Sequence, residues 1–167
     1  MINILKLIHA FLGLNAIGAA VPVCLRMVAG RPCDKWVAHF LKFSLAASAV
    51  GMVLSIGHTS FTQSLAMLGV YASAVSVLSL YRLQSNENWE AALVMSTMCV
   101  LCLDGVIAMA HLFKFLAVCN VMEVSQQGVP FAISMAAVVL LFAFLSILAL
   151  KKIDHEPSAS VMQKVTR

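Results

Sequence analysis

The sequence predicts an all-α integral membrane bundle with about five transmembrane helices, and two observations carry this prediction. The first is composition: 62% of the 167 residues are hydrophobic and only 11% are charged, with a mean hydropathy of +0.96. A typical soluble domain is charged at about a quarter of its positions, so this chain has too little charge to cover a globule with polar surface. Composition therefore excludes a soluble enzyme, a nucleic-acid-binding protein and a disordered chain.

The second observation is a set of five segments long and apolar enough to cross a hydrocarbon core, which takes about 20 residues of helix. Their polar insertions are mostly Ser, Thr, Gly and Cys, small residues that let membrane helices approach closely. The period-two alternation of a membrane β-barrel is not visible. The predicted spans are residues 4–25, 36–57, 65–81, 91–113 and 130–150.

Each span ends where polar or helix-breaking residues begin. Gly30 and Pro32 interrupt the chain after the first span, a short polar turn follows the second, and Asn86 and Asn88 follow the third. A polar stretch follows the fourth span and ends just before Pro130. Residues 1–150 are therefore predicted to form one transmembrane domain, and residues 151–167 a short cytoplasmic tail.

The first span has an alternative interpretation as a cleaved signal peptide, which would leave four helices. Its basic leading region is a lone Lys6, and its apolar run is longer than the usual core of a signal peptide. These two features favour a first helix that is retained.

Basic residues are concentrated on one side of the predicted bundle. Two lie on the opposite side, Lys6 and Lys114. The larger group comprises Arg26, Arg31, Lys35, Arg82, Lys151, Lys152, Lys164 and Arg167. This positive-inside asymmetry predicts an N-terminus outside and a C-terminus in the cytoplasm. We expect a bacterial inner membrane, with the lipid bilayer as the main partner and no nucleic-acid partner.

With this topology, three histidines converge on the outer leaflet. His9 lies near the outer end of the first span, His58 closes the second, and His111 lies near the outer end of the fourth. Helical spacing places each of them on a stripe of small residues that faces the bundle interior. Asp104 shares the His111 stripe, two turns deeper, and an ionisable residue within a span is usually functional.

These residues predict a haem b site, or less favourably a copper site, made by His9, His58 and His111. Neutral imidazole binds haem iron axially and also suits copper, and we expect His58 and His111 to be the axial pair. Asp104 would orient a ligand as a hydrogen-bond acceptor or carry a proton. Such a protein would exchange electrons with a quinone or a partner protein.

The alternative is a cofactor-free accessory or structural subunit of a larger membrane complex. In that case each histidine hydrogen-bonds a neighbouring helix or headgroup water, and Asp104 bonds a serine or a backbone carbonyl across the helix seam. The short loops favour this interpretation, because nothing outside the bilayer is large enough to bind an elaborate substrate. The inward histidines and Asp104 favour the redox interpretation.

The cysteines suggest a weaker hypothesis. Cys99 and Cys102 form a C-x-x-C, as in quinone-coupled membrane thiol oxidoreductases, but such pairs act at a membrane surface and this one lies mid-helix with no Lys or Arg nearby. We therefore expect all five cysteines to serve as small apolar filler.

The first span also carries a resemblance. Residues 5–13, in which His9 is followed by Gly13, resemble the first helix of the copper-resistance D-type transmembrane domain, without the tryptophan–glycine pair expected there after the histidine. The resemblance covers one helix in five and implies that His9 is a haem or copper ligand.

Overall fold

The computed structural model describes residues 2–30, 35–55, 61–83, 89–118 and 128–155, and they are helical almost throughout. The five α-helices are α1 (Ile2–Val28), α2 (Lys35–Leu54), α3 (Phe61–Leu83), α4 (Glu90–Val118) and α5 (Val129–His155). The described ranges contain no strand, and each helix is long and apolar enough to cross a membrane. The predicted all-α class and the five apolar helices are confirmed.

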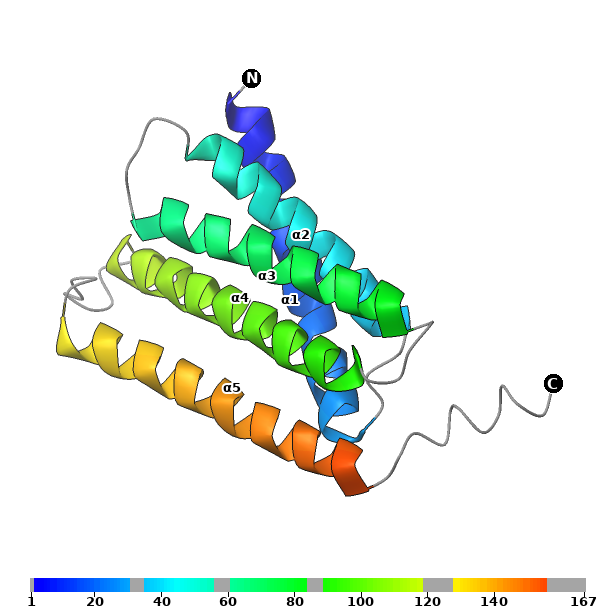
Figure 1. Ribbon diagram of the computed structural model, residues 1–167. Helices are drawn as coiled ribbons and strands as arrows, with labels where there is room; N and C mark the ends of the chain where they lie inside the picture. The colour runs from blue at the N-terminus through cyan, green and yellow to red at the C-terminus, as the bar shows by residue number, and fades with distance from the viewer. Residues whose placement is uncertain (1, 31–34, 56–60, 84–88, 119–127, 156–167) are drawn as a thin grey trace.

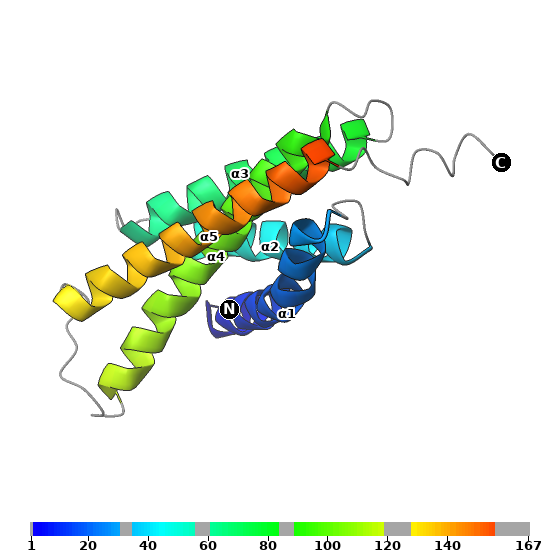
Figure 2. The ribbon, with the colours of Figure 1, turned by 90° about the horizontal axis from the view of Figure 1, so that it is seen from below.

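Consecutive helices pack side by side, from α1 on α2 through to α4 on α5 (Figure 1). The first helix lies behind α2 in this view, crosses it, and also contacts α4 and α5. Figure 2 shows α1 and α2 on one side of the molecule and α3 and α5 on the other. The bundle is therefore a sequential up-and-down arrangement whose first helix also contacts the last.

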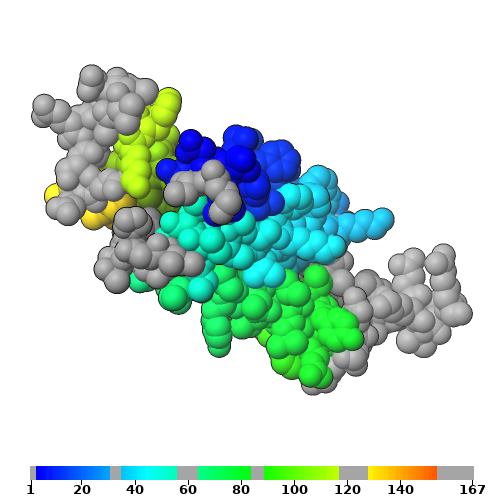
Figure 3. All heavy atoms as spheres, turned by 90° about the horizontal axis from the view of Figure 1, so that it is seen from above, coloured from blue at the N-terminus to red at the C-terminus, as the bar shows by residue number. Residues whose placement is uncertain are grey.

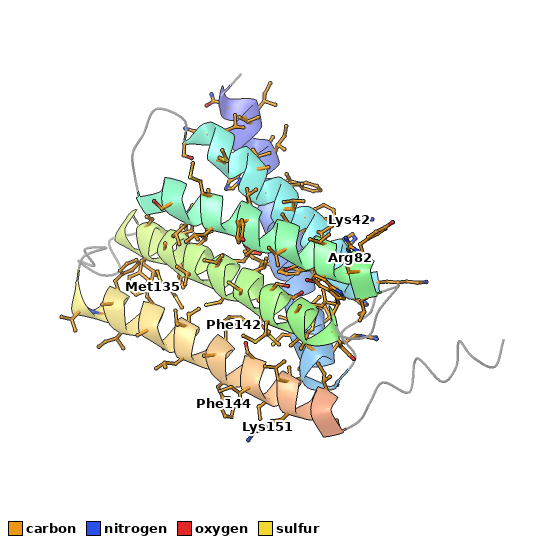
Figure 4. All side chains as sticks on the ribbon, in the orientation of Figure 1. Lys42, Arg82, Met135, Phe142, Phe144 and Lys151 are labelled. Atoms are coloured by element: carbon orange, nitrogen blue, oxygen red, sulfur yellow. The ribbon has the colours of Figure 1, made fainter. Side chains whose placement is uncertain are left out.

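The alternating directions of the helices give the bundle two chemically different ends. One end carries the last turn of α1, the first turn of α2 and the last turn of α3, with Arg26, Lys35 and Arg82. Lys151 of α5 lies at the same end, as Figure 4 shows for Arg82 and Lys151. We call it the basic end. The opposite end carries His9 and His111, and we call it the histidine end.

The close-packed core lies nearer the basic end. Its largest fully buried side chains come from α1, α2 and α4, and they include Met27, Phe40, Leu41, Leu93, Met98 and Leu101. Toward the histidine end packing is looser: every residue from 102 to 110 of α4 is half-buried and His111 is exposed. The mid-point of α4 therefore separates a tight half of the bundle from an open half.

The helix bounds differ from the predicted spans at several ends. The predicted spans are bounded by apolar composition, whereas a helix continues for as long as its backbone hydrogen bonds do. Four of the five helices therefore extend beyond the predicted spans at both ends. The predicted tail from residue 151 begins inside α5, which continues to His155. The predicted end of the second span, Gly57, lies outside the described residues, and α2 itself ends at Leu54.

The outer faces of the bundle are apolar. Within an 18-residue apolar stretch of α5, only 6% is buried inside the protein, and the corresponding share in α1 is 17%. Phe144 points away from the bundle and is 58% exposed, whereas Phe142 points toward α4 (Figure 4). Such a surface suits lipid rather than water.

Candidate functional site

His9 lies on α1 and is directed at α2. Its Nδ1 is 3.0 Å from the backbone carbonyl oxygen of Ala47, a hydrogen bond between the two helices. The ring sits against Gly51, where an added Cβ would lie 3.1 Å from the His9 Cε1 atom. A side chain at position 51 would therefore crowd the imidazole, and glycine makes room for it. The nitrogen left for any further ligand is Nε2.

Asp104 lies at the middle of the apolar part of α4, where the tight half of the bundle meets the open half. The Ser44 hydroxyl of α2 donates a hydrogen bond of 2.8 Å to its Oδ2 atom. Ser44 is completely buried, while Asp104 is half-buried. The neighbouring Gly105 faces α5, against Phe142. The carboxyl group therefore has a hydrogen-bond partner on α2.

His111 lies two turns beyond Asp104 on α4, at the histidine end, and is exposed. His9 and Lys114 are near enough for their charges to act on the His111 ring. In the view from above in Figure 3, the start of α1 (dark blue) and the last turns of α4 (yellow-green) appear toward the same end of the molecule. The structure thus brings His9 and His111 to one region of the bundle, although they are about a hundred positions apart in sequence.

The predicted trio is only partly described. His58 lies outside the described residues. Among the described ranges, no group of three or more His, Cys, Asp or Glu side chains could hold a metal ion. The role of His9, His58 and His111 as haem or copper ligands therefore stays a prediction. For Asp104, the serine partner on a neighbouring helix is the contact that the structural alternative expects.

A row of buried hydroxyls went unnoticed in the sequence. Ser73, Ser76 and Ser79 of α3 are all completely buried, and so is Thr97 of α4. The Ser76 and Ser79 hydroxyls donate to carbonyl oxygens one turn back in their own helix. The Ser73 Oγ and Thr97 Oγ1 atoms have no hydrogen-bond partner among the described residues. The 3-and-4 spacing of small residues along α3 was the signal that could have identified this face.

His39 and the C-x-x-C pair have other surroundings. His39 packs between Trp36 and Phe43, with ring centroids 6.4 Å and 4.5 Å away, so it is part of an aromatic row on α2. A shallow hollow beside it is lined by α1 and α2 residues, Asn15 among them. Cys99 is exposed and Cys102 half-buried, both as free thiols.

Comparison with known proteins gives no match. No protein-family model matches the chain, and neither a curated protein nor a solved structure does.

Proposed function

We propose that this chain is a multi-pass integral membrane protein whose five helices all cross the bilayer. The support is the apolar outer surface: Leu7, Leu14, Leu140 and other large side chains are more than two-thirds exposed along α1 and α5. In water this surface would drive aggregation, whereas in lipid it faces its natural solvent. Extraction of native membranes with alkaline carbonate tests this: the chain should stay in the pellet, and its release into the supernatant would refute the proposal.

The function that the geometry supports best within this frame is that of an accessory or structural subunit in a larger membrane assembly. One observation carries it: the His9 ring and the Asp104 carboxyl group form hydrogen bonds between helices, His9 with the Ala47 carbonyl and Asp104 with the Ser44 hydroxyl. Interhelical hydrogen bonds of this kind hold membrane helices together and fix their register. These bonds give the His9 imidazole and the Asp104 carboxyl group a structural role.

Native gels of mildly solubilised membranes test the subunit role. A chain tagged at its C-terminus and expressed from its own locus should migrate in an assembly of reproducible composition, and its partners should lose stability when it is deleted. Migration as a lone monomer or homo-oligomer in several mild detergents, with no effect of deletion on other membrane proteins, would exclude the subunit role.

A second candidate is the redox protein, with haem b or copper near the outer surface. The observation in its favour is the approach of His9 and His111 at the histidine end, where the His9 Nε2 atom is not the one bonded to Ala47. A haem needs two imidazoles, and the loose packing of α4 beyond Asp104 would admit the edge of a porphyrin. The test is a reduced-minus-oxidised spectrum of the detergent-purified protein, which should show the α-band of haem b. Haem-replete expression without that band, together with metal analysis that finds no copper, would remove this candidate.

A further inference from the structure

Four polar residues recur along α4 at intervals of seven: Glu90, Thr97, Asp104 and His111. Seven residues turn a helix through almost two full turns, so positions seven apart drift by only about 20° and share one face. From Glu90 to His111 the helix rises about 32 Å, which matches the roughly 30 Å thickness of a hydrocarbon core. This polar stripe therefore runs along α4 from one membrane surface to the other.

The neighbouring helices bring hydroxyl groups to the same stripe. Ser48 of α2 touches Gly69 of α3, where an added Cβ would lie 2.7 Å from the Ser48 Oγ atom. The two helices are antiparallel. One turn from this contact toward the basic end lie Ser44 on α2 and Ser73 on α3, so these two residues also share one level. Ser44 bonds Asp104, so Ser73 lies at the level of the carboxyl group.

From that level toward the basic end, buried hydroxyls follow one another on α3 and α4, two helices that pack together. Ser73, Ser76 and Ser79 follow one another along the buried face of α3, and Thr97 lies on the α4 stripe between Asp104 and Glu90. All four are completely buried. Serine and threonine hydroxyls can each accept one proton and donate another.

The unpartnered Ser73 and Thr97 hydroxyls point to water inside this row. A buried polar group without a partner costs about 1–3 kcal/mol, and a bound water is the usual way to satisfy it. Both atoms are fully buried and have no partner in the described part of the chain. Water between them would connect the hydroxyls of α3 with those of α4.

Toward the histidine end the side chains of the stripe are less buried than Thr97 is. Asp104 and Ala108 are half-buried, and His111 is exposed with His9 nearby. A carboxyl group at mid-membrane thus has two imidazoles toward one end of the bundle and buried hydroxyls toward the other.

We propose that this polar stripe is a proton pathway across the membrane, with Asp104 as its central proton carrier. A proton that enters from the histidine end binds the Asp104 carboxylate and neutralises it. The carboxylic acid then gives its proton to a water or hydroxyl of the row, and each hydroxyl in turn accepts one proton and releases its own toward Glu90. Asp104 returns to the carboxylate form, so the cycle needs water and a proton gradient alone. The inference requires the membrane-spanning bundle and is independent of the subunit role and of any haem.

Proton flux into proteoliposomes tests the pathway. The full chain is reconstituted into vesicles that contain a pH-sensitive dye, and a potassium gradient with valinomycin drives protons inward. The wild-type protein should acidify the interior faster than protein-free vesicles do. Asp104→Asn should reduce the flux to the protein-free rate, while Thr97→Val and Ser73→Ala should lower it several-fold. Ser134→Ala removes a hydroxyl that bonds only the Pro130 carbonyl of its own helix, and should leave the flux unchanged.

Two measurements keep the test decisive. Asparagine keeps an oxygen that can accept the Ser44 hydrogen bond, so Asp104→Asn is expected to fold, and circular dichroism with gel filtration checks this. Flotation of the vesicles shows whether the protein is inserted: failure to float would contradict the membrane proposal itself. Inserted wild-type protein with no flux above protein-free vesicles, or a folded Asp104→Asn variant that conducts like the wild type, would overturn the proton pathway alone.

Discussion

Single atoms decide how closely α2 and α3 approach one another. At Gly69 an added Cβ would lie 2.7 Å from the Ser48 Oγ atom, which is well inside van der Waals contact. We therefore expect Gly69→Ala to lower the free energy of unfolding in detergent by about 1–2 kcal/mol, since overpacking outweighs the gain in helix propensity. Steric-trap or thermal unfolding measures this change.

Two matched variants separate that contact from a general effect of glycine replacement. Gly13→Ala adds a methyl group where no atom lies within 4 Å, so its stability should be unchanged or slightly higher. Ser48→Ala combined with Gly69→Ala removes the crowded oxygen and should recover most of the loss. Equal destabilisation by Gly13→Ala and Gly69→Ala would show that the Ser48 contact is not the cause.

The hydrogen bond between Ser44 and Asp104 is a second feature at the scale of single residues. Interhelical hydrogen bonds in membrane proteins contribute about 0.6 kcal/mol on average and up to about 1.7 kcal/mol. Ser44 is completely buried, so we expect a coupling energy of about 1 kcal/mol in a double-mutant cycle of Ser44→Ala with Asp104→Ala. The measurement is unfolding in detergent of the wild type, both single variants and the double variant. A coupling energy of zero would contradict the bond.

Sequence spacing could predict only part of the candidate site. It put His9 and Asp104 on helix faces with small residues, and the structure places both against α2. It did not identify Ser73 or Thr97, because buried serine and threonine are ordinary in membrane helices and carry no charge to draw notice. Which hydroxyls lack a partner depends on the neighbouring helix, and no single-helix pattern contains that information.

At the scale of helices, the end of α1 depends on Gly30. Its backbone has φ of 73°, and its N–H donates to the Met27 carbonyl at 3.1 Å, closing the last turn. A left-handed conformation costs an alanine about 1–2 kcal/mol, whereas asparagine tolerates it better. We expect Gly30→Ala to destabilise the bundle by about that amount and Gly30→Asn to do so less, measured by unfolding in detergent.

The contact of Gly30 with α5 needs its own control. An added Cβ would lie 2.9 Å from the Lys152 Cγ atom. Gly30→Ala should therefore be measured again in a Lys152→Ala background and compared with Lys152→Ala alone. If Gly30→Ala still lowers stability in that background, the cause is backbone strain. If it no longer does, the whole effect comes from the contact with the Lys152 side chain.

The existence of the helices could be predicted from the sequence more fully than their ends. Runs of Leu, Val, Ala and Met predict five apolar helices, because each run is about long enough to cross a hydrocarbon core. The ends are set by local bonds that composition does not reveal, such as the Ser55 N–H on the Gly51 and Met52 carbonyls after α2. A helix can also continue through charged residues, as α5 does through Lys151 and Lys152.

At the scale of the whole molecule, the arrangement of α1 is the feature that sequence left open. Its small-residue stripe indicates which face packs inward, but not which of the other helices that face contacts. In the structure α1 packs on α2 and reaches α5, and it contributes the buried side chains Ala16, Ala19, Val23 and Met27.

The orientation of the bundle is the last prediction, and it rests on the charge of its two ends. Arg26, Lys35, Arg82 and Lys151 lie at the basic end, and short basic loops are retained on the cytoplasmic side. A reporter fused after Arg167 should therefore be active only in the cytoplasm.

Two cysteines introduced into a cysteine-free background make this a matched experiment. A cysteine at Thr62, in the first turn of α3, should react with a membrane-impermeant maleimide added to intact cells. A cysteine at Ser85, between α3 and α4, should react only after the cells are opened, because Thr62 lies at the start of α3 and Ser85 follows its end. The reverse labelling would invert the bundle, and protons would then enter the polar stripe from the cytoplasmic side. Labelling of both positions from outside would mean that α3 does not cross the membrane, which would remove the stripe's hydroxyl-lined wall and the proton pathway with it.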